Sequence, residues 1–167
     1  MFTFLYALIF LPPSVCDSAF AYMQYPQTNV YQMQYNTCLD VARKSILAGL
    51  DPDKAVSAAI QESDLLPDRI SSANAQGPLQ VTHFWCTEKM EECDLTYAGV
   101  RALNLLRTCK YINWQDYSCK RLYKTPLEWK EVFCHYNAGN KCNEASYDYA
   151  EDIIRRAKKI KGIRKSI

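Results

Sequence analysis

Eight cysteines in a chain of 167 residues limit its fold more than any other feature of the sequence. An oxidising compartment joins cysteines in disulfides, whereas a reducing cytosol leaves them as free thiols or metal ligands. The chain has no Cys-x-x-Cys pair and two histidines, His83 and His135, which is weak support for zinc. We therefore expect an exported protein that is stapled by disulfides and has no metal or other cofactor.

Three pairs of cysteines are close enough in the sequence to form disulfides across loops, although spacing does not prove connectivity. The pairs are Cys86 with Cys93, Cys109 with Cys119, and Cys134 with Cys142. The pairing of the other two cysteines, Cys16 and Cys38, depends on the fate of the N-terminal segment.

The N-terminal segment resembles the hydrophobic core of a secretory signal. Residues 1–11 form an apolar run that is too short to span a bilayer comfortably, and Pro12 with Pro13 should end any helix there. Residues 19–21, Ala-Phe-Ala, match the small-x-small pattern of a cleavage site. We therefore predict a signal peptide over residues 1–21 and a mature chain in the periplasm or outside the cell.

Alternatives remain open at this end of the chain. No positive charge lies near Met1, so the segment also fits an uncleaved membrane anchor or a misassigned start codon. Cleavage after Ala21 would remove Cys16 and leave an odd number of cysteines. Either Cys38 is then a buried free thiol, or Cys16 is retained and joins it, or the local pairing is different.

Composition predicts one packed domain between a lead-in and a basic tail. Hydrophobic residues make up 49% of the chain and charged residues 23%, as in globular proteins. Residues 22–36 are rich in Tyr and Gln without a helical period, so we expect them to be extended. The domain should cover residues 37–160, and residues 161–167 form the tail.

Charge gives little indication of a partner. The net charge is +2, which does not suggest a nucleic-acid partner, and we expect a monomer. We interpret the basic run over residues 155–165 as a solvated helix end that complements the helix dipole. Attraction to anionic polymers or lipid surfaces is the alternative.

Asp51-Pro52 should begin a helix, because it places an N-cap side chain before a proline at the first helical position. The helix should run to about Ser63, with Glu62 at the edge of its apolar arc. Burial penalises a charged carboxylate, so we expect a raised pKa for Glu62 and the ability to donate a proton near neutral pH. The simpler interpretation is a rim glutamate paired with Arg69 or a loop amide.

Residues 62–80 read Glu62-Ser63-x-Leu65-x-Pro67-x-x-x-Ser71-x-x-x-Ala75-x-Gly77-x-Leu79-Gln80. This run resembles the signature Glu-Ser-x-Phe-x-Pro-x-Ala-x-Ser-x-x-Gly-Ala-x-Gly-Leu-Met-Gln of the soluble lytic transglycosylases, a lysozyme-like family that cleaves peptidoglycan. The departures are Leu65, Arg69, Asn74, Pro78 and Leu79. Asn74 is the mildest, because Asn tolerates positive φ better than other non-glycine residues.

Three later stretches keep the family's order and approximate spacing. Residues 97–106 resemble its helix with a glycine before a Leu-rich segment, residues 133–139 contain its Tyr-Asn-Ala-Gly motif, and residues 147–154 resemble its final helix. The resemblance spans about residues 37–160 and implies an all-α, lysozyme-like domain of about six or seven helices. Its implied partner is the peptidoglycan glycan strand, in a cell envelope, a secretion system or a phage.

The resemblance also implies roles for side chains. Glu62 would be the acid and base of a lytic transglycosylase, which cleaves between N-acetylmuramic acid and N-acetylglucosamine and forms a 1,6-anhydro ring. Gly77 and Pro78 would fold the loop back to make a cleft with Gln80 at its floor, and Tyr149 would orient Glu62. Sugar hydroxyl and acetamido groups need polar partners and flat faces, which predicts the substrate-binding set Ser63, Ser71, Gln80, Tyr136, Asn137 and Tyr149.

The aromatic residues also have simpler interpretations, because most tyrosines only cap a core. We expect His83 and Trp85 to pack against the loop that Cys86 closes. Trp114 and Trp129 should fill the core or shield disulfides rather than bind sugars.

Two other functions remain as alternatives. A hydrolase resembling goose-type lysozyme needs a second carboxylate at roughly 5–10 Å from the acid, and no motif selects one from Asp64, Asp68, Glu88, Glu91, Glu92 and Asp94. A non-catalytic glycan-binding or assembly module would keep the fold and lose the acid, yet Glu62 is present.

Overall fold

The computed structural model describes residues 2–86 and 88–166, and most of this chain is helical. Met1 and Ile167, the ends of the predicted leader and tail, lie outside the described residues. The elements are α1 (Phe2–Met23), α2 (Tyr31–Leu47), α3 (Pro52–Ser63), η1 (His83–Trp85), η2 (Met90–Glu92), α4 (Leu95–Thr108), β1 (Cys109–Asn113), β2 (Ser118–Leu122), α5 (Trp129–Ala138) and α6 (Glu144–Ser166). This architecture agrees with the expectation of a helical domain, apart from the unexpected pair of strands.

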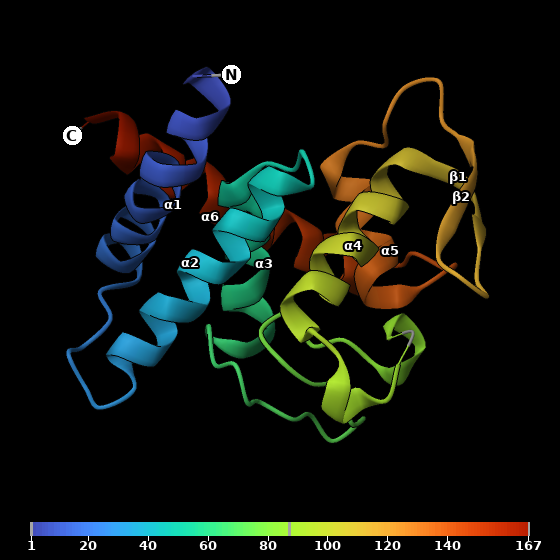
Figure 1. Cartoon of the computed structure of the whole chain (residues 1–167), viewed down its shortest axis with the longest axis horizontal. Coiled ribbons are helices and arrows are strands. Elements are labelled where there is room, and N and C mark those ends of the chain that lie inside the picture. Colours follow the sequence, from blue (N-terminus) through green and yellow to red (C-terminus); the bar gives the residue numbers. More distant parts are fainter. Residues whose placement is uncertain (1, 87, 167) are drawn as a thin grey trace.

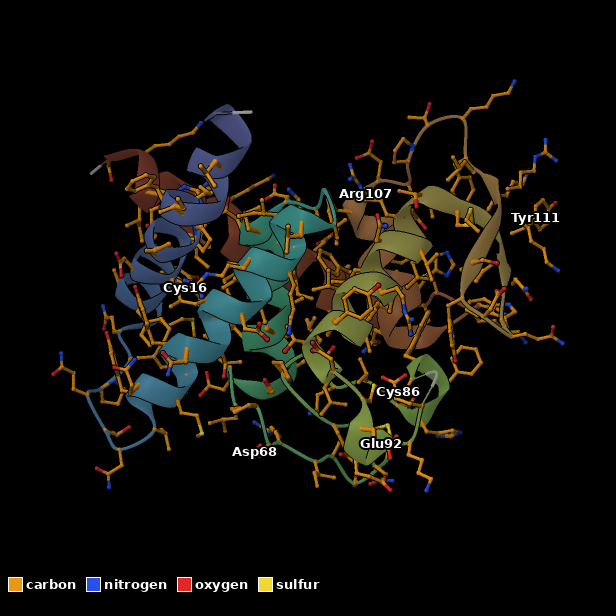
Figure 2. All side chains as sticks on the ribbon, viewed as in Figure 1. Cys16, Asp68, Cys86, Glu92, Arg107 and Tyr111 are labelled. Atoms are coloured by element: carbon orange, nitrogen blue, oxygen red, sulfur yellow. A yellow bond between two sulfur atoms is a disulfide. The ribbon has the colours of Figure 1, made fainter. Side chains whose placement is uncertain are left out.

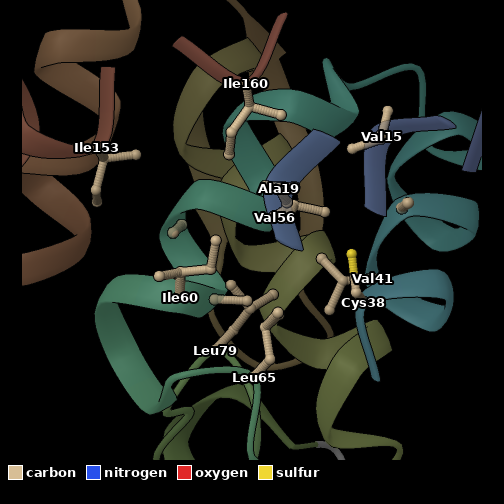
Figure 3. Close-up of a cluster of buried hydrophobic side chains, with 14 of the residues drawn as sticks. Val15, Ala19, Cys38, Val41, Val56, Ile60, Leu65, Leu79, Ile153 and Ile160 are labelled. Atoms are coloured by element: carbon tan, nitrogen blue, oxygen red, sulfur yellow. The ribbon is translucent and has the colours of Figure 1, made fainter. Parts of the chain in front are cut away.

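The helices form two groups that α6 joins. In Figure 1, α1, α2 and α3 lie on one side together with both chain ends, and α4, α5 and the two strands lie on the other. α6 packs against α1, α3 and α5, so it crosses from one group to the other. The central core contains buried residues from all six α-helices and from the loop after α3. Figure 3 shows Val15, Val41, Val56, Leu65, Leu79 and Ile160 among them.

The N-terminal segment is a helix of the folded domain. α1 continues through Pro12 and Pro13, so the expectation that these prolines end any helix is wrong. A proline cannot donate its backbone nitrogen to the preceding turn, and tertiary contacts compensate for this. Ala19 is fully buried, α1 packs against α2, and a disulfide joins Cys16 to Cys38. Cleavage after Ala21 stays a prediction.

The expectation of an extended lead-in over residues 22–36 is wrong at both ends, because α1 runs to Met23 and α2 begins at Tyr31. Packing against α1 explains why the second half of this segment is helical. The ring centroid of Phe20 in α1 lies 4.9 Å from the ring centroid of Tyr31 and 5.3 Å from the ring centroid of Tyr35. The buried side chain of Gln34 also donates to the backbone oxygen of Asp64 at 2.9 Å. These contacts come from distant elements, and local periodicity carries no signal of them.

α3 agrees with the prediction from the sequence at both ends. The carboxylate of Asp51 accepts a hydrogen bond from the backbone N–H of Asp53 at 3.0 Å, Pro52 is the first helical residue, and the helix ends at Ser63. The N-cap and the proline therefore act as their positions indicated.

β1 and β2 form an antiparallel hairpin in which Ile112 lies opposite Cys119 and Asn113 opposite Ser118. The turn between them contains Tyr117 at φ 55°. A disulfide joins Cys109 at the start of β1 to Cys119 in β2. The expectation of an all-α chain missed this hairpin, although the predicted staple between these two cysteines marks its place.

The basic tail continues α6 rather than leaving the domain. Arg164 donates two hydrogen bonds, at 2.9 Å and 2.7 Å, to the carboxylate of Asp53, whose side chain is 2% exposed. A buried ion pair of this kind is costly to break, because the remaining partner becomes an unpaired buried charge. The last turn of α6 is thus fixed to the first turn of α3.

Four disulfides are present, and the described residues contain no free cysteine. The three predicted local pairs are confirmed. Of the alternatives left open for Cys38, the structure has the one in which Cys16 is retained and joins it. Within residues 2–86 and 88–166, no helix has both the length and the hydrophobicity needed to cross a bilayer.

Candidate active site

Glu62 lies in the last turn of α3, where the backbone reverses direction. Asp64 and Leu65, directly after the helix, have left-handed conformations with φ of 59° and 61°. The chain then returns to the helix end, where the hydroxyl of Ser63 donates to the backbone oxygen of Pro78 at 2.9 Å. A buried hydroxyl thus fastens the loop beside Glu62.

The carboxyl group of Glu62 is partly buried, and its surroundings favour the protonated form. Burial raises its pKa, and the hydrogen bond from the hydroxyl of Tyr149 opposes this by lowering it. In the part of the chain that the structure describes, no second carboxylate contributes to this shift. A single carboxyl group that retains a proton to higher pH is suited to general acid catalysis.

Two tyrosines from different helices flank this group. Tyr149 of α6 donates its hydroxyl to Oε1 of Glu62. Tyr136 of α5 donates its hydroxyl to the backbone oxygen of Leu79 at 2.6 Å. Burial raises both phenol pKa values well above the usual range, and the nearby charge of Glu62 raises them further. Both tyrosines therefore stay protonated and act as hydrogen-bond donors.

Comparisons of the chain with protein-family models, curated proteins and solved structures give no match.

Two residues predicted to bind substrate are committed to the loop instead. Ser63 is fully buried, and its hydroxyl contacts the backbone oxygens of Ala59 and Pro78, so it cannot touch a ligand. The side-chain amide of Gln80 donates to the backbone oxygens of Arg69 and Gly77, both at 2.9 Å. With both N–H groups used, Gln80 stabilises the loop and does not offer them to a sugar.

Two other members of the predicted set differ in their surroundings. The hydroxyl of Ser71 accepts the backbone N–H of Ala75 at 3.0 Å and so closes a turn. Asn137 is exposed in the last turn of α5, next to Tyr136. The structure thus brings Glu62 and Tyr149 together with Tyr136 nearby, and it leaves Ser71 in the loop.

Small or permissive residues let this loop approach its neighbours. A side chain at Gly77, which has φ of 79°, would place Cβ 2.7 Å from Cβ of Leu95. A side chain at Gly99 of α4 would place Cβ 2.5 Å from Cβ of Leu79. Asn74 has φ of 59°, which agrees with the expectation that Asn replaces a glycine there at little cost.

Some of the carboxylates considered as a second catalytic group bind other side chains of the protein. Asp64 accepts a hydrogen bond from the hydroxyl of Tyr25, a residue of the lead-in. Asp94 caps α4 and forms an ion pair with Lys44 at 2.8 Å. Figure 2 places Asp68, in the loop after α3, and Glu92, at the end of η2, at the lower edge of the molecule. None of these positions indicates a carboxylate that faces Glu62.

The sequence did not predict an aromatic pocket of about 500 Å³ that lies beside the hairpin. Trp114 was expected to fill the core or shield a disulfide; it is 47% exposed, so it is outside the core, and it lies against Phe84, with ring centroids 5.3 Å apart. Tyr136 lines this pocket, whereas Glu62 does not. Trp85 packs with Cys86 and Cys93, and Trp129 stacks on Phe133, both as predicted. The sequence signal for the pocket was the run of aromatic residues around the hairpin.

One group of potential metal ligands occurs among the described residues. Glu131, His135 and Cys142 have ligand atoms within 4.8 Å of one another. Cys142 is bonded to Cys134, so its sulfur is not the thiolate that a metal requires. The hydroxyl of Tyr147 also donates to Glu131 at 3.2 Å. The oxidised protein thus offers two ligands here, fewer than a structural zinc site uses.

Proposed function

We propose that the protein is a peptidoglycan lytic transglycosylase in which Glu62 is both acid and base. The observation that carries this proposal is the placement of Glu62, partly buried at the end of α3 and hydrogen-bonded by Tyr149. The proposal also depends on the resemblance of residues 62–80 and 133–139 to that family. Its setting would be outside the reducing cytosol, which the four disulfides support.

The reaction needs one proton to leave Glu62 and one to return. In the first step, protonated Glu62 donates to the oxygen that links C1 of N-acetylmuramic acid to N-acetylglucosamine, and the C1–O bond breaks. In the second step, the carboxylate takes the proton from the muramyl C6 hydroxyl, whose oxygen bonds to C1. The products are a free N-acetylglucosamine end and a 1,6-anhydro end, and Glu62 is protonated again.

The tyrosines would hold the acid and the loop during both steps. The hydroxyl of Tyr149 keeps Oε1 of Glu62 in one orientation, which leaves the other carboxyl oxygen for the substrate. Tyr136 fixes the backbone of Leu79 and lies where a sugar next to Glu62 would be in reach. Such preorganisation is what general acid catalysis requires.

The substitution Glu62→Gln tests the proposal, with Glu91→Gln as the matched control. Gln keeps the size of the side chain but cannot donate and recover the proton, so turnover of purified peptidoglycan should fall by at least ~10²–10⁴-fold. Glu91 is exposed in η2, and its replacement should leave turnover unchanged. Soluble muropeptides released over time, separated and weighed by mass spectrometry, give the rate and the product.

The masses of the products separate this function from its alternatives. A transglycosylase releases muropeptides with 1,6-anhydro ends, which are one water lighter than the reducing ends released by a hydrolase. Reducing ends from the wild type would establish the goose-type alternative with a second carboxylate. Binding to peptidoglycan without release, by wild type and Glu62→Gln alike, would establish a non-catalytic module.

A further inference from the structure

The aromatic pocket beside the hairpin, here called the hairpin pocket, has no assigned role so far. It lies between η1, the end of α4, the hairpin and the end of α5. Its volume is about 500 Å³, and it is lined by Phe84, Trp85, Leu106, Cys109, Lys110, Ile112, Trp114, Tyr123, Leu127, His135, Tyr136, Gly139 and Asn140. A concave site with mainly apolar walls and a few polar groups is typical of a ligand pocket.

The charge of the hairpin pocket has one sign. No aspartate or glutamate is among its lining residues, whereas Lys110 is. In the described chain, Lys110 forms no ion pair within 4.0 Å, and its ammonium lies over the ring of Tyr111, 5.7 Å from the centroid. This arrangement favours a ligand that carries a carboxylate.

Two aromatic side chains of the pocket wall are partly exposed to solvent. Phe84 is 45% exposed and Trp114 47% exposed, although each contacts other rings. The disulfide between Cys109 and Cys119 holds the hairpin together on the side of the pocket. Exposed apolar groups on a fixed support mark a binding surface that is formed before the ligand arrives.

Tyr136 connects the hairpin pocket to the candidate catalytic acid. It lines the pocket, its hydroxyl donates to the backbone oxygen of Leu79, and the charge of Glu62 acts on it. Tyr136 thus lines the pocket and also lies within electrostatic reach of Glu62. A substrate cleaved at Glu62 would have its neighbouring groups at the pocket.

We propose that the hairpin pocket binds the carboxylate-bearing stem peptide attached to the muramyl residue of the glycan. This inference depends on the proposed function, because it takes peptidoglycan as the substrate. The sugars of the strand are neutral, whereas its stem peptides carry carboxylates that Lys110 can pair with and methyl groups that Phe84 and Trp114 can cover. The pocket thus selects strands that still bear their peptides.

Binding of a free stem peptide tests the pocket without any turnover. The full oxidised chain with Glu62→Gln would be titrated calorimetrically with the tetrapeptide L-Ala-γ-D-Glu-diaminopimelate-D-Ala, and we expect saturable binding that weakens as salt is added. Lys110→Met should raise Kd about tenfold, as expected for a hydrogen-bonded charge. Lys120→Met is the matched control, because Lys120 is on the same hairpin but does not line the pocket, and it should leave Kd unchanged.

Changing the ligand gives a second test that does not depend on how the variants fold. The same peptide with its carboxylates amidated should bind at least tenfold more weakly to the Glu62→Gln protein. No binding of the free peptide, or equal binding of the amidated one, would overturn the inference. So would an equal loss of affinity in Lys110→Met and Lys120→Met.

The two proposals fail in different ways. Release of 1,6-anhydro products by the wild type, with no peptide binding, overturns the pocket assignment and leaves the catalytic one intact. Peptide binding with the predicted dependence on Lys110, without release of any product, supports the pocket and overturns the catalytic assignment.

Discussion

Two opposing influences on the pKa of Glu62, burial and the hydroxyl of Tyr149, determine when this carboxyl group is protonated. Burial raises its pKa, and the hydrogen bond from Tyr149 lowers it, with burial the larger influence. A raised pKa in the folded state means that Glu62 favours folding at low pH and stops doing so as pH rises through that value. The same titration should govern activity, because only protonated Glu62 is a general acid.

We therefore predict that kcat/KM falls as pH rises through the pKa of Glu62, and that Tyr149→Phe moves this fall to higher pH. The substitution removes the hydroxyl that stabilises the carboxylate, so the pKa rises further. The measurement is a profile of kcat/KM for muropeptide release between about pH 4 and 9, where a single acid gives one descending limb.

Tyr147→Phe serves as the control for this profile. Tyr147 lies on the same helix as Tyr149, and its hydroxyl donates to Glu131 instead of Glu62. Its profile should overlay that of the wild type. An unchanged limb in Tyr149→Phe would contradict the role given to that hydroxyl, and a bell with a second carboxylate limb would favour the hydrolase.

The surroundings of some site residues could be predicted from the sequence, and those of others could not. The pKa direction of Glu62 followed from its place on a helical wheel, and its contact with Tyr149 was implied by the family resemblance. Ser63 and Gln80, predicted to bind substrate, donate hydrogen bonds to the backbone of the loop, because a polar side chain in a motif can serve its own loop as well as a ligand. Only the path of the loop decides between these roles.

At the scale of elements, the loop after α3 is positioned by its contact with α4. Gly99 of α4 allows Leu79 to approach so closely that an added Cβ would lie 2.5 Å from Cβ of Leu79. The backbone oxygen of Leu79 in turn accepts the hydroxyl of Tyr136. The packing of α4 against the loop is therefore linked to the candidate site.

Gly99→Ala should destabilise the protein by about 1–3 kcal/mol, because the methyl group overpacks the contact with Leu79. For a chain of this size, each kcal/mol lowers Tm by about 2–4 °C. Gly162→Ala is the matched control, since Gly162 lies within α6 with no atom near its added Cβ. It should raise stability by up to about 1 kcal/mol. Equal melting temperatures for the two variants would contradict the close contact.

Elements were predictable where their signals are local. Asp51 and Pro52 specify the start of α3 through capping and backbone geometry alone. The start of α2 and the continuation of α1 through Pro12 depend on contacts between those two helices, which no window of sequence contains. The sequence pattern did not reveal the hairpin, because its strands are short and every residue of β2 is exposed, so β2 has no alternation of buried and exposed residues.

At the scale of the whole molecule, the disulfide between Cys16 and Cys38 joins the predicted leader to the rest of the domain. Ala19 and Val15 of the leader are fully buried in the central core, as Figure 3 shows. The cysteine count left this pairing as one of several alternatives, because sequence spacing does not report which helices lie together.

We predict that the double variant Cys16→Ser/Cys38→Ser is less stable than the wild type by about 3 kcal/mol, because the cross-link restricts the unfolded chain. The free energy of unfolding, from guanidinium titration without reductant, measures the loss. Thiol counting on the denatured wild type should find none of the eight cysteines reactive. An unchanged denaturation midpoint, or two reactive thiols in the wild type, would contradict the contribution of this disulfide.

The link between Cys16 and Cys38 also changes what proteolysis can achieve at this end of the chain. A cut after Ala21 in the oxidised protein would break one peptide bond without separating the pieces, since Cys16 lies before the cut and Cys38 after it. The result would be a two-chain protein with the mass of the uncut chain plus one water. Its short chain would appear on a gel only after reduction.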